Sequence, residues 1–386
     1  MRNFAAGLLM FSLVNILYKP TFTIAMMFMI IILFIDIRRN GLSHCLKQFK
    51  IEQQLVKSIM MFFICMFIAN LLAINSFGML TTYHYFYRTL PFWMFIYLGK
   101  EHNIKRGIEY GLIFSIIWLC IFGVEEHYYN KDIRISGFFY GAPNAYAIML
   151  EQLLPFGIGF ALAACSNKIK ILFAFLSLMM WYCLYYTQSR GAIGGTMIAV
   201  VIISGIYMWK SFREKICLKK IIALVGLLVI ILGCGINSRL NARVNYDDER
   251  LLLIQSTYNM WSDNKMIGVG SGNWVKSYRE KYISPKAKEP DLDMAHNVPL
   301  QVLAETGIIG GVGFFIMNFG IGYFLIKKIF SYQDNIIVLF MLWTFLVFNI
   351  HSLVDYGLFF KYGFRLFWGL LGIAYISQNN FIKHVE

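Results

Sequence analysis

Long apolar runs with few charges recur along the whole chain, and they limit how it can fold more than any other feature. Each run approaches the roughly 20 residues that cross a bilayer as a helix. The chain has 386 residues, of which 58% are hydrophobic and 15% are charged, whereas a soluble domain would separate such runs with charged segments. The runs are too long for barrel strands and lack period-two alternation. The pattern predicts an all-α integral membrane protein.

The length criterion predicts about twelve transmembrane helices in one polytopic membrane domain that covers residues 1–386. The first run has no small-residue cleavage site, so we expect a retained helix there rather than a signal peptide. The predicted spans are 4–18, 21–37, 58–76, 80–98, 107–124, 144–163, 169–187, 191–209, 219–236, 299–326, 334–353 and 362–378.

The short loops give the expected orientation. Their Lys and Arg residues fall on one side when twelve spans are assumed, and the positive-inside rule makes that side, with both termini, cytoplasmic. The net charge of +14 is largely this signal, and contact with anionic membrane lipids fits it too. The basic residues are spread over separate loops without an aromatic-rich polar domain, so no nucleic-acid partner is expected.

The seven cysteines do not indicate a disulfide framework. Five lie in or at the ends of predicted spans and two lie in predicted cytoplasmic loops, and none falls in the main body of the external loop. No spacing of His, Cys and Asp is typical of a metal site. We therefore expect neither a metal nor a cofactor.

One inter-helix segment is long. It covers about residues 237–298, between predicted helices nine and ten, and it falls on the external, periplasmic side. A loop of this length is usually functional. Within it, Leu251, Ile254, Tyr258 and Trp261 recur at helical spacing and predict an amphipathic helix on the membrane or on the bundle.

Cationic side chains recur at the external ends of the predicted spans. A planar guanidinium donates two parallel hydrogen bonds to phosphate, so their convergence predicts a site for a polyanion at the lipid boundary. Taken alone, Arg190 fits a snorkelling role as well as a functional one, and Arg134, Lys361 and His296 fit a structural or interfacial role better. Asp355 could simply pair with Lys361 or Arg365. The converging set is His84, Arg88, Arg134, Arg190, Arg250, His296, Lys361 and Arg365.

Three motifs resemble the O-antigen ligase and polymerase superfamily. They are "YYTQSRGAIGG", "DERLLLIQSTYNMWSDNKMIGVGSGNW" and "AHNVPLQVLAETGIIGGVGFF", and "GAPNAYAIMLEQLLP" is similar to a fourth block. The resemblance covers roughly residues 125–325 in the family's order. It implies a glycosyltransferase of the bacterial inner membrane with a periplasmic active site. It also implies an undecaprenyl-diphosphate-linked glycan donor and no need for metal or nucleotide.

The resemblance carries Arg190, Arg250 and His296 over as catalytic residues. The arginines would neutralise the departing diphosphate, and His296 would take the proton from the attacking hydroxyl, in an inverting transfer. The substrate-binding candidates are Arg134, Arg365, Arg88, His84 and Asn297.

The acceptor divides the family's activities. A ligase passes the glycan to a lipid A–core sugar, and a polymerase passes it to another lipid-linked repeat unit. The block around Arg134 and the segment from Asp355 to Arg365 favour the ligase. A transporter of lipid-linked glycans is the alternative of another class, but it would show inverted repeats and polar sites at the midplane.

Overall fold

All regular elements in the described part of the chain are helices. The structure is a computed structural model, and it describes residues 1–15, 17, 20–49, 51–74, 76–100, 102–131, 134–163, 166–214, 245–287, 290–331, 336–355 and 357–380. The helices are α1 (Arg2–Val14), α2 (Pro20–Asn40), α3 (Leu42–Gln48), α4 (Gln53–Leu72), α5 (Ser76–Tyr87), α6 (Leu90–Gly99), α7 (Lys105–Tyr129), α8 (Pro143–Ala163), α9 (Asn167–Tyr186), α10 (Arg190–Glu214), α12 (Asn245–Asp263), α13 (Trp274–Ser277), the π-helix η1 (Tyr278–Tyr282), α14 (Val298–Ser331), α15 (Ile336–His351) and α16 (Lys361–Asn380).

Seven of the described helices are long and apolar enough to cross a membrane, judged by length and composition. They are α2, α4, α7, α8, α9, α10 and α14, and α1 and α15 are shorter apolar helices. The predicted span 219–236 lies outside the described residues. The all-helical, multi-pass class is confirmed, while the number of twelve spans stays a prediction.

The predicted span 80–98 was wrong as a single helix. The structure divides it into α5 and α6, with a break at Arg88 and Thr89. Pro91 stands in the first turn of α6. Its nitrogen cannot donate a hydrogen bond and its ring clashes with the carbonyl four residues earlier, so the apolar run cannot continue as one helix.

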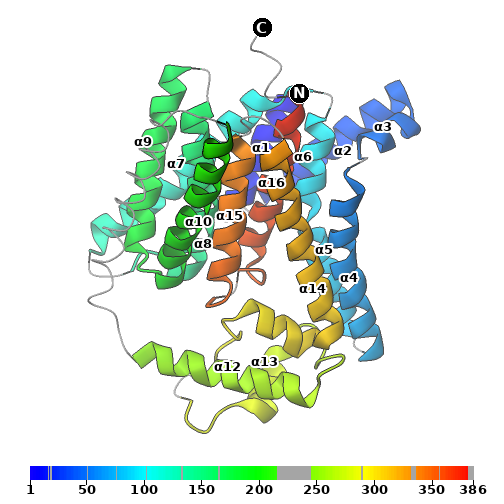
Figure 1. Cartoon of the computed structure of the whole chain (residues 1–386), viewed down its shortest axis with the longest axis vertical. Coiled ribbons are helices and arrows are strands. Elements are labelled where there is room, and N and C mark those ends of the chain that lie inside the picture. Colours follow the sequence, from blue (N-terminus) through cyan, green and yellow to red (C-terminus); the bar gives the residue numbers. More distant parts are fainter. Residues whose placement is uncertain are drawn as a thin grey trace.

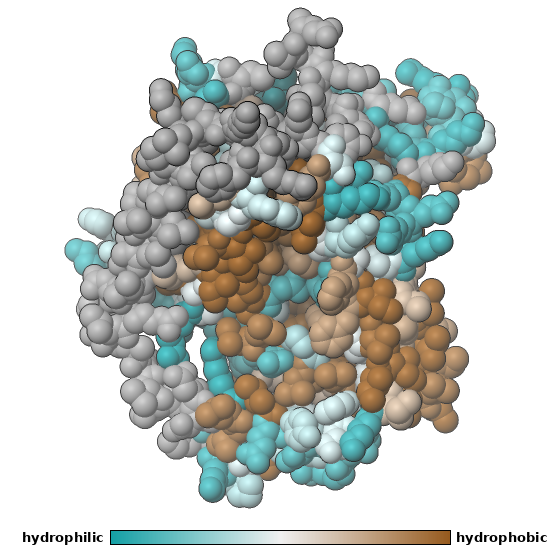
Figure 2. Space-filling view, in the orientation of Figure 1, coloured by the Kyte–Doolittle hydropathy of each residue, from teal (hydrophilic) through white to brown (hydrophobic). Residues whose placement is uncertain are grey.

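The helices form a bundle whose outer surface is apolar. Buried side chains from nearly every helix of the bundle join one large hydrophobic cluster. The outward faces of α4 and α14 expose large apolar side chains such as Phe67, Leu71, Phe315 and Phe319. Figure 2 shows this apolar surface on the right of the molecule, above a more polar lower end. Such a belt suits contact with lipid tails.

Residues 245–287 and 290–297, which we name the cap, fold on one end of the bundle (Figure 1). The cap has its own hydrophobic core, which includes Leu253, Met260, Trp274 and Tyr278. The rings of Trp274 and Tyr278 stack with centroids 4.9 Å apart, and the Trp274 indole N–H donates to Thr257 Oγ1 at 3.1 Å. The long predicted loop is therefore a small folded unit over its described part.

A kink in α14 docks the cap onto the bundle. Gly307 interrupts the helix at φ 60° and ψ −164°. A Cβ at Gly307 would meet the Met266 carbonyl carbon at 2.2 Å, so a larger residue would push the cap loop away. The loop pairs with the helix there, because the N–H groups of Val269 and Gly270 donate to the carbonyls of Ala304 and Glu305 at 2.9 and 2.8 Å.

Several basic residues gather at the opposite end of the bundle from the cap. Lys327 and Lys328 lie 3.0 and 3.3 Å from the Glu52 carboxylate, and Lys100 Nζ donates to the Lys47 carbonyl at 3.1 Å. The N-terminus lies at this end as well (Figure 1). The described basic loops therefore share one end, as the predicted topology requires.

Candidate functional site

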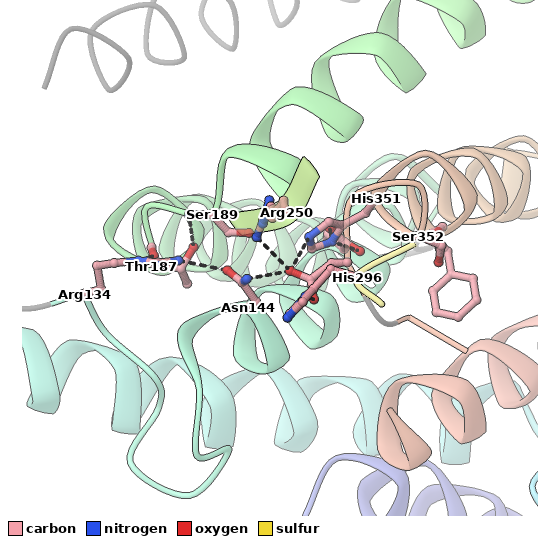
Figure 3. Close-up of polar contacts among 11 residues, drawn as sticks. Arg134, Asn144, Thr187, Ser189, Arg250, His296, His351 and Ser352 are labelled. Carbon is pink, nitrogen blue, oxygen red and sulfur yellow. Dashed lines mark hydrogen bonds and ion pairs between the residues drawn. The ribbon is translucent and has the colours of Figure 1, made fainter. Parts of the chain in front are cut away.

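A buried carboxylate, Asp355, is the centre of a polar cluster between the bundle and the cap. Asp355 follows α15 and is 1% exposed. The cap approaches it through His296 Nδ1 at 3.3 Å from Oδ1 and through Arg250 Nη2 at 3.9 Å from Oδ2. From the bundle, the Asn144 amide donates to Oδ2, and His351 Nε2 lies 3.7 Å from Oδ2. Figure 3 shows these side chains pointing toward one another.

Burial alone would raise the pKa of the Asp355 carboxyl, because it disfavours the charged form. The hydrogen bond from His296 and the nearby imidazole of His351, with the positive charge that the two rings can carry, instead hold the pKa of Asp355 below the usual range. Asp355 is therefore a carboxylate at neutral pH. It presents a fixed negative charge to groups that arrive from both the cap and the bundle.

His296 is held in a strained backbone position directly before α14. Its φ is 50°, which non-glycine residues rarely adopt and which often marks functional sites. Its two neighbours fix it. The Ala295 N–H donates to Gln301 Oε1 at 3.0 Å, and Asn297 Oδ1 accepts from the Leu300 N–H at 2.9 Å as a helix cap. The strain is thus maintained by bonds on both sides of the imidazole.

Arg250 reaches Asp355 from α12, a helix with apolar residues on more than one face. Leu251 and Tyr258 are 64% and 52% exposed, whereas Leu253 and Met260 are buried. Spacing alone identified an apolar stripe and missed the second one, which the cap core covers. Arg250 lies between these faces, and its side chain is 32% exposed.

Behind Asp355, a second carboxylate supports His351. Glu151 of α8 is fully buried, and its two oxygens lie 2.9 and 3.0 Å from His351 Nδ1. Glu151, His351, Asp355 and His296 thus form a continuous polar chain from the bundle to the cap. Buried charged groups of this kind are rare and costly unless each is paired, as these are.

Arg190 begins α10 beside this chain. The next residue, Gly191, packs directly on the His351 ring: a Cβ there would meet His351 Cδ2 at 2.5 Å. Arg190 itself is partly buried. The "TQSRGAIGG" motif therefore places the first turn of α10 against the polar chain, and its small residue allows that close approach.

Arg134 is tied into the same region through Asn144. Its Nη2 donates to Asn144 Oδ1 at 2.8 Å, and its Nε donates to the Thr187 carbonyl at 2.8 Å. Asn144 in turn donates to Asp355. Arg134 thereby joins the motif that contains Thr187 to the block that begins α8, and it orients the amide that faces the carboxylate (Figure 3).

The other predicted substrate-binding residues have different surroundings. Asn297 caps α14 and also donates to the Leu353 carbonyl at 3.0 Å, so it links the cap to the segment that holds Asp355. His84 is exposed, with its ring 5.8 Å from that of Tyr83. Arg88 and Arg365 form no ion pair with Asp355 among the described residues and lie over aromatic rings instead.

Sequence reasoning missed the acidic half of the site. Pairing of Asp355 with Lys361 or Arg365 was one alternative from the sequence, and among the described residues Asp355 instead pairs with the cap and with His351. Glu305, a buried carboxylate of α14, accepts from Gln301 Nε2 at 3.3 Å. His351 and Asp355 are four residues apart, a helical spacing that puts them on one face, and an intramembrane Glu151 was a second available signal.

The arrangement offers the Arg250 guanidinium and the His296 imidazole at a buried carboxylate, at the joint between bundle and cap. Arg190 begins the helix that packs beside this cluster. Arginines can stabilise negative charge on a departing phosphate, and an imidazole oriented by a carboxylate can accept a proton. Among the described residues, no group of three or more His, Cys, Asp or Glu side chains could hold a metal ion.

Comparison with known proteins gives a match in the part of the chain that contains Arg190, Arg250 and His296. A family model described as O-antigen ligase matches residues 175–315, a stretch that contains Arg190, Arg250 and His296. None of the curated proteins compared with the chain matches it significantly. The family match confirms the resemblance found in the motifs, and it assigns this part of the chain to the O-antigen ligase and polymerase superfamily.

Proposed function

We propose that this protein is an O-antigen ligase that transfers a glycan from undecaprenyl diphosphate to a sugar of lipid A–core. The observation that carries the proposal is the meeting of His296 and Arg250 at one buried carboxylate, Asp355, which lies some 60 to 100 residues further along the chain. The family match supports an activity of the ligase or polymerase type on lipid-linked glycans.

In the proposed reaction, the acceptor hydroxyl attacks C1 of the donor sugar. The new C1–O bond forms as the bond from C1 to the phosphate oxygen breaks, and undecaprenyl diphosphate leaves. Attack opposite the leaving group inverts the anomeric centre. Negative charge grows on the departing oxygen, and Arg190 and Arg250 would stabilise it, each worth roughly 3–4 kcal/mol for a preorganised donor.

His296 would act as the general base. Because a carboxylate can only accept hydrogen bonds, the His296 Nδ1 that faces Asp355 carries the hydrogen. Nε2, across the ring, then has the lone pair that takes the proton of the acceptor hydroxyl. Asp355 would also stabilise the imidazolium that forms, and its low pKa keeps the proton on His296 rather than on the carboxylate.

The proposed orientation puts the cap in the periplasm. The basic loops at the opposite end of the bundle would then face the cytoplasm, as the positive-inside rule requires. The polyprenyl tail of the donor would lie against the apolar belt, and its glycan would project toward the cap. We assign the chain to the bacterial inner membrane on this basis.

Two measurements test the proposal. Purified protein in detergent should transfer glycan from a lipid diphosphate donor to lipid A–core without a membrane gradient, which a transporter would not do. Lipopolysaccharide gels of a deletion strain should lack O-antigen on lipid A–core, while long glycan chains accumulate on the carrier lipid. Single repeat units on lipid A–core would instead identify a polymerase.

A further inference from the structure

A second cationic cluster lies in the bundle, formed by Arg88 and Arg365. Arg88 stands at the break between α5 and α6, with its guanidinium carbon 4.7 Å from the centroid of Tyr85. Arg365 lies in the second turn of α16, 4.5 Å from the centroid of Phe22 and 5.4 Å from that of Tyr87. Both side chains are partly buried, and Arg365 lies over the ring of Tyr87, the residue directly before Arg88, so the two cations share one region.

Neither arginine has a carboxylate partner among the described residues. Both lack an ion pair within that part of the chain, and the buried Nη1 of Arg88 and Nε of Arg365 have no hydrogen-bond acceptor there. Aromatic faces attract a cation but accept no strong hydrogen bond from its N–H groups. The guanidinium groups of Arg88 and Arg365 therefore share one aromatic environment, and one N–H donor of each has no acceptor among the described residues.

The cluster is separate from the site at Asp355. Gly363 of α16 faces α8, since a Cβ there would meet Ile148 Cγ2 at 2.6 Å. Successive helical residues are rotated by about 100°, so Arg365, two residues later, points to the other side of α16. There it contacts α2 and α5 instead of α8. The first turns of α16 thus lie between the two clusters.

From this juxtaposition we propose that Arg88 and Arg365 bind the phosphate group of a second lipid, the acceptor glycolipid. The inference rests on the proposed function, in which two amphiphilic substrates meet and only one of them loses its diphosphate at Arg190 and Arg250. The other lipid needs an anchor that leaves its sugar free to reach His296. Two neighbouring guanidinium groups match a phosphate in charge and in hydrogen-bond geometry.

The surroundings of Arg88 and Arg365 distinguish this cluster from arginines that extend to the membrane surface. A snorkelling arginine extends its head into the lipid headgroup region, whereas Arg88 and Arg365 are stacked on rings inside the bundle. Lys361 marks a more exposed position one turn before Arg365, with its Nζ 4.7 Å from the Tyr362 ring. Lys361 would meet the phosphate first as it enters.

The test counts bound lipid diphosphate by native mass spectrometry of the full chain in a neutral detergent. Undecaprenyl diphosphate serves as the probe, because it carries the phosphate chemistry of both substrates without a glycan. The parent should bind two probe molecules. Arg88→Gln with Arg365→Gln should bind one, as should Arg190→Gln with Arg250→Gln, and the quadruple variant should bind none.

Matched variants control for folding and for charge. Arg279→Gln, on the cap surface beside Asp291 and Asp293, should still bind two probes. Arg88→Lys with Arg365→Lys keeps the charge but loses the forked geometry, so it should bind the second probe about tenfold more weakly. In transfer assays, the double Gln variant should raise the acceptor KM at least tenfold and leave the donor KM within about twofold.

Several outcomes would overturn the proposal. A folded double Gln variant that still binds two probes would show that the phosphate lies elsewhere. Equal displacement of the second probe by phosphatidylglycerol would assign the cluster to bulk anionic lipid, and displacement by inorganic diphosphate alone would assign it to a free anion. Probe binding needs no turnover. A chain without transferase activity would therefore contradict the proposed function, while the number of bound probes would still test the phosphate site at Arg88 and Arg365.

Discussion

The two arginine clusters of this protein differ in how their positive charge is balanced. Around Asp355, Arg250 and His296 each face a buried carboxylate, and His351 is paired in turn with Glu151. Around Arg88 and Arg365, aromatic rings take the place of carboxylates in the described part of the chain. We refer to these as the paired cluster and the unpaired cluster.

The difference teaches what each cluster can do. A carboxylate that already satisfies an imidazole fixes its tautomer and direction, which suits a group that must act as a base. A guanidinium pair without an internal anion is costly in an apolar bundle, at roughly 2.5–3.5 kcal/mol per arginine on insertion scales. Binding an anion offsets that cost, which suits the unpaired cluster to a substrate phosphate.

The largest expected effect comes from removing the working groups of the paired cluster. His296→Ala and Arg250→Ala should each lower kcat at least ~100-fold, because a base and a charge-stabilising donor each contribute that much or more. Glycan transfer by purified protein in detergent measures this, with Arg279→Ala as the matched cap control. Full activity in a stably expressed His296→Ala variant would remove the imidazole from the mechanism.

A smaller effect should follow when the paired cluster loses its own anion. Asp355→Asn removes the charge that orients His296 and faces Arg250, so kcat should fall about 10- to 100-fold, part of what a general base supplies. Removing one member of a buried charge network also destabilises, by roughly 3–5 kcal/mol. Thermal unfolding measured beside turnover separates the two effects, and Asp355→Glu should recover part of each. A wild-type kcat in the Asp355→Asn variant would contradict the role of the Asp355 carboxylate in orienting His296.

Loosening the cap should affect one cluster and spare the other. Gly307→Ala places a Cβ against the Met266 carbonyl and forces an alanine to φ 60°, which costs on the order of 1–3 kcal/mol. Transfer should weaken because the cap delivers Arg250 and His296, while probe binding at Arg88 and Arg365 should be unchanged. Limited proteolysis of the cap reports the loosening, with Gly205→Ala as a control because its Cβ would meet open space. A cap as resistant as the parent's would show that the kink does not hold it.

The smallest expected effect is that of a chelator. In the proposed reaction arginines stabilise the charge that a divalent ion could otherwise stabilise, so EDTA at millimolar concentration should change the transfer rate by less than about twofold. The assay is the same detergent transfer reaction, with added Mg²⁺ as the comparison. Loss of activity that Mg²⁺ restores would show that the arginines do not act alone.

The sequence predicted much of the fold from composition and run length. Apolar runs with few charges can only be satisfied as membrane helices, so the class did not depend on any contact between them. The prediction of a single helix over residues 80–98 was wrong because Pro91 interrupts the helix within an otherwise uniform apolar run. The amphipathic helix predicted in the long loop is present as α12, and the sequence did not show that a second apolar set, with Leu253 and Met260, joins the cap core.

The cationic half of the candidate site was readable as well. Arg190, Arg250 and His296 stand in motifs that the family match also covers. The carboxylate at the centre of the site could not be predicted, because nothing in the order of residues shows that Asp355 faces His296, 59 residues earlier in the chain. A carboxylate near two cations in sequence was naturally assigned to them.

By itself, the sequence determined that this chain is a helical membrane protein with arginines and an imidazole near the ends of its helices. Those properties follow from local composition, since each helix must satisfy its own backbone whatever its neighbours do. Only the tertiary structure decided which cations meet a carboxylate and which lie on aromatic rings. That choice depends on distances between distant segments, and a kinked helix and a docked cap set those distances.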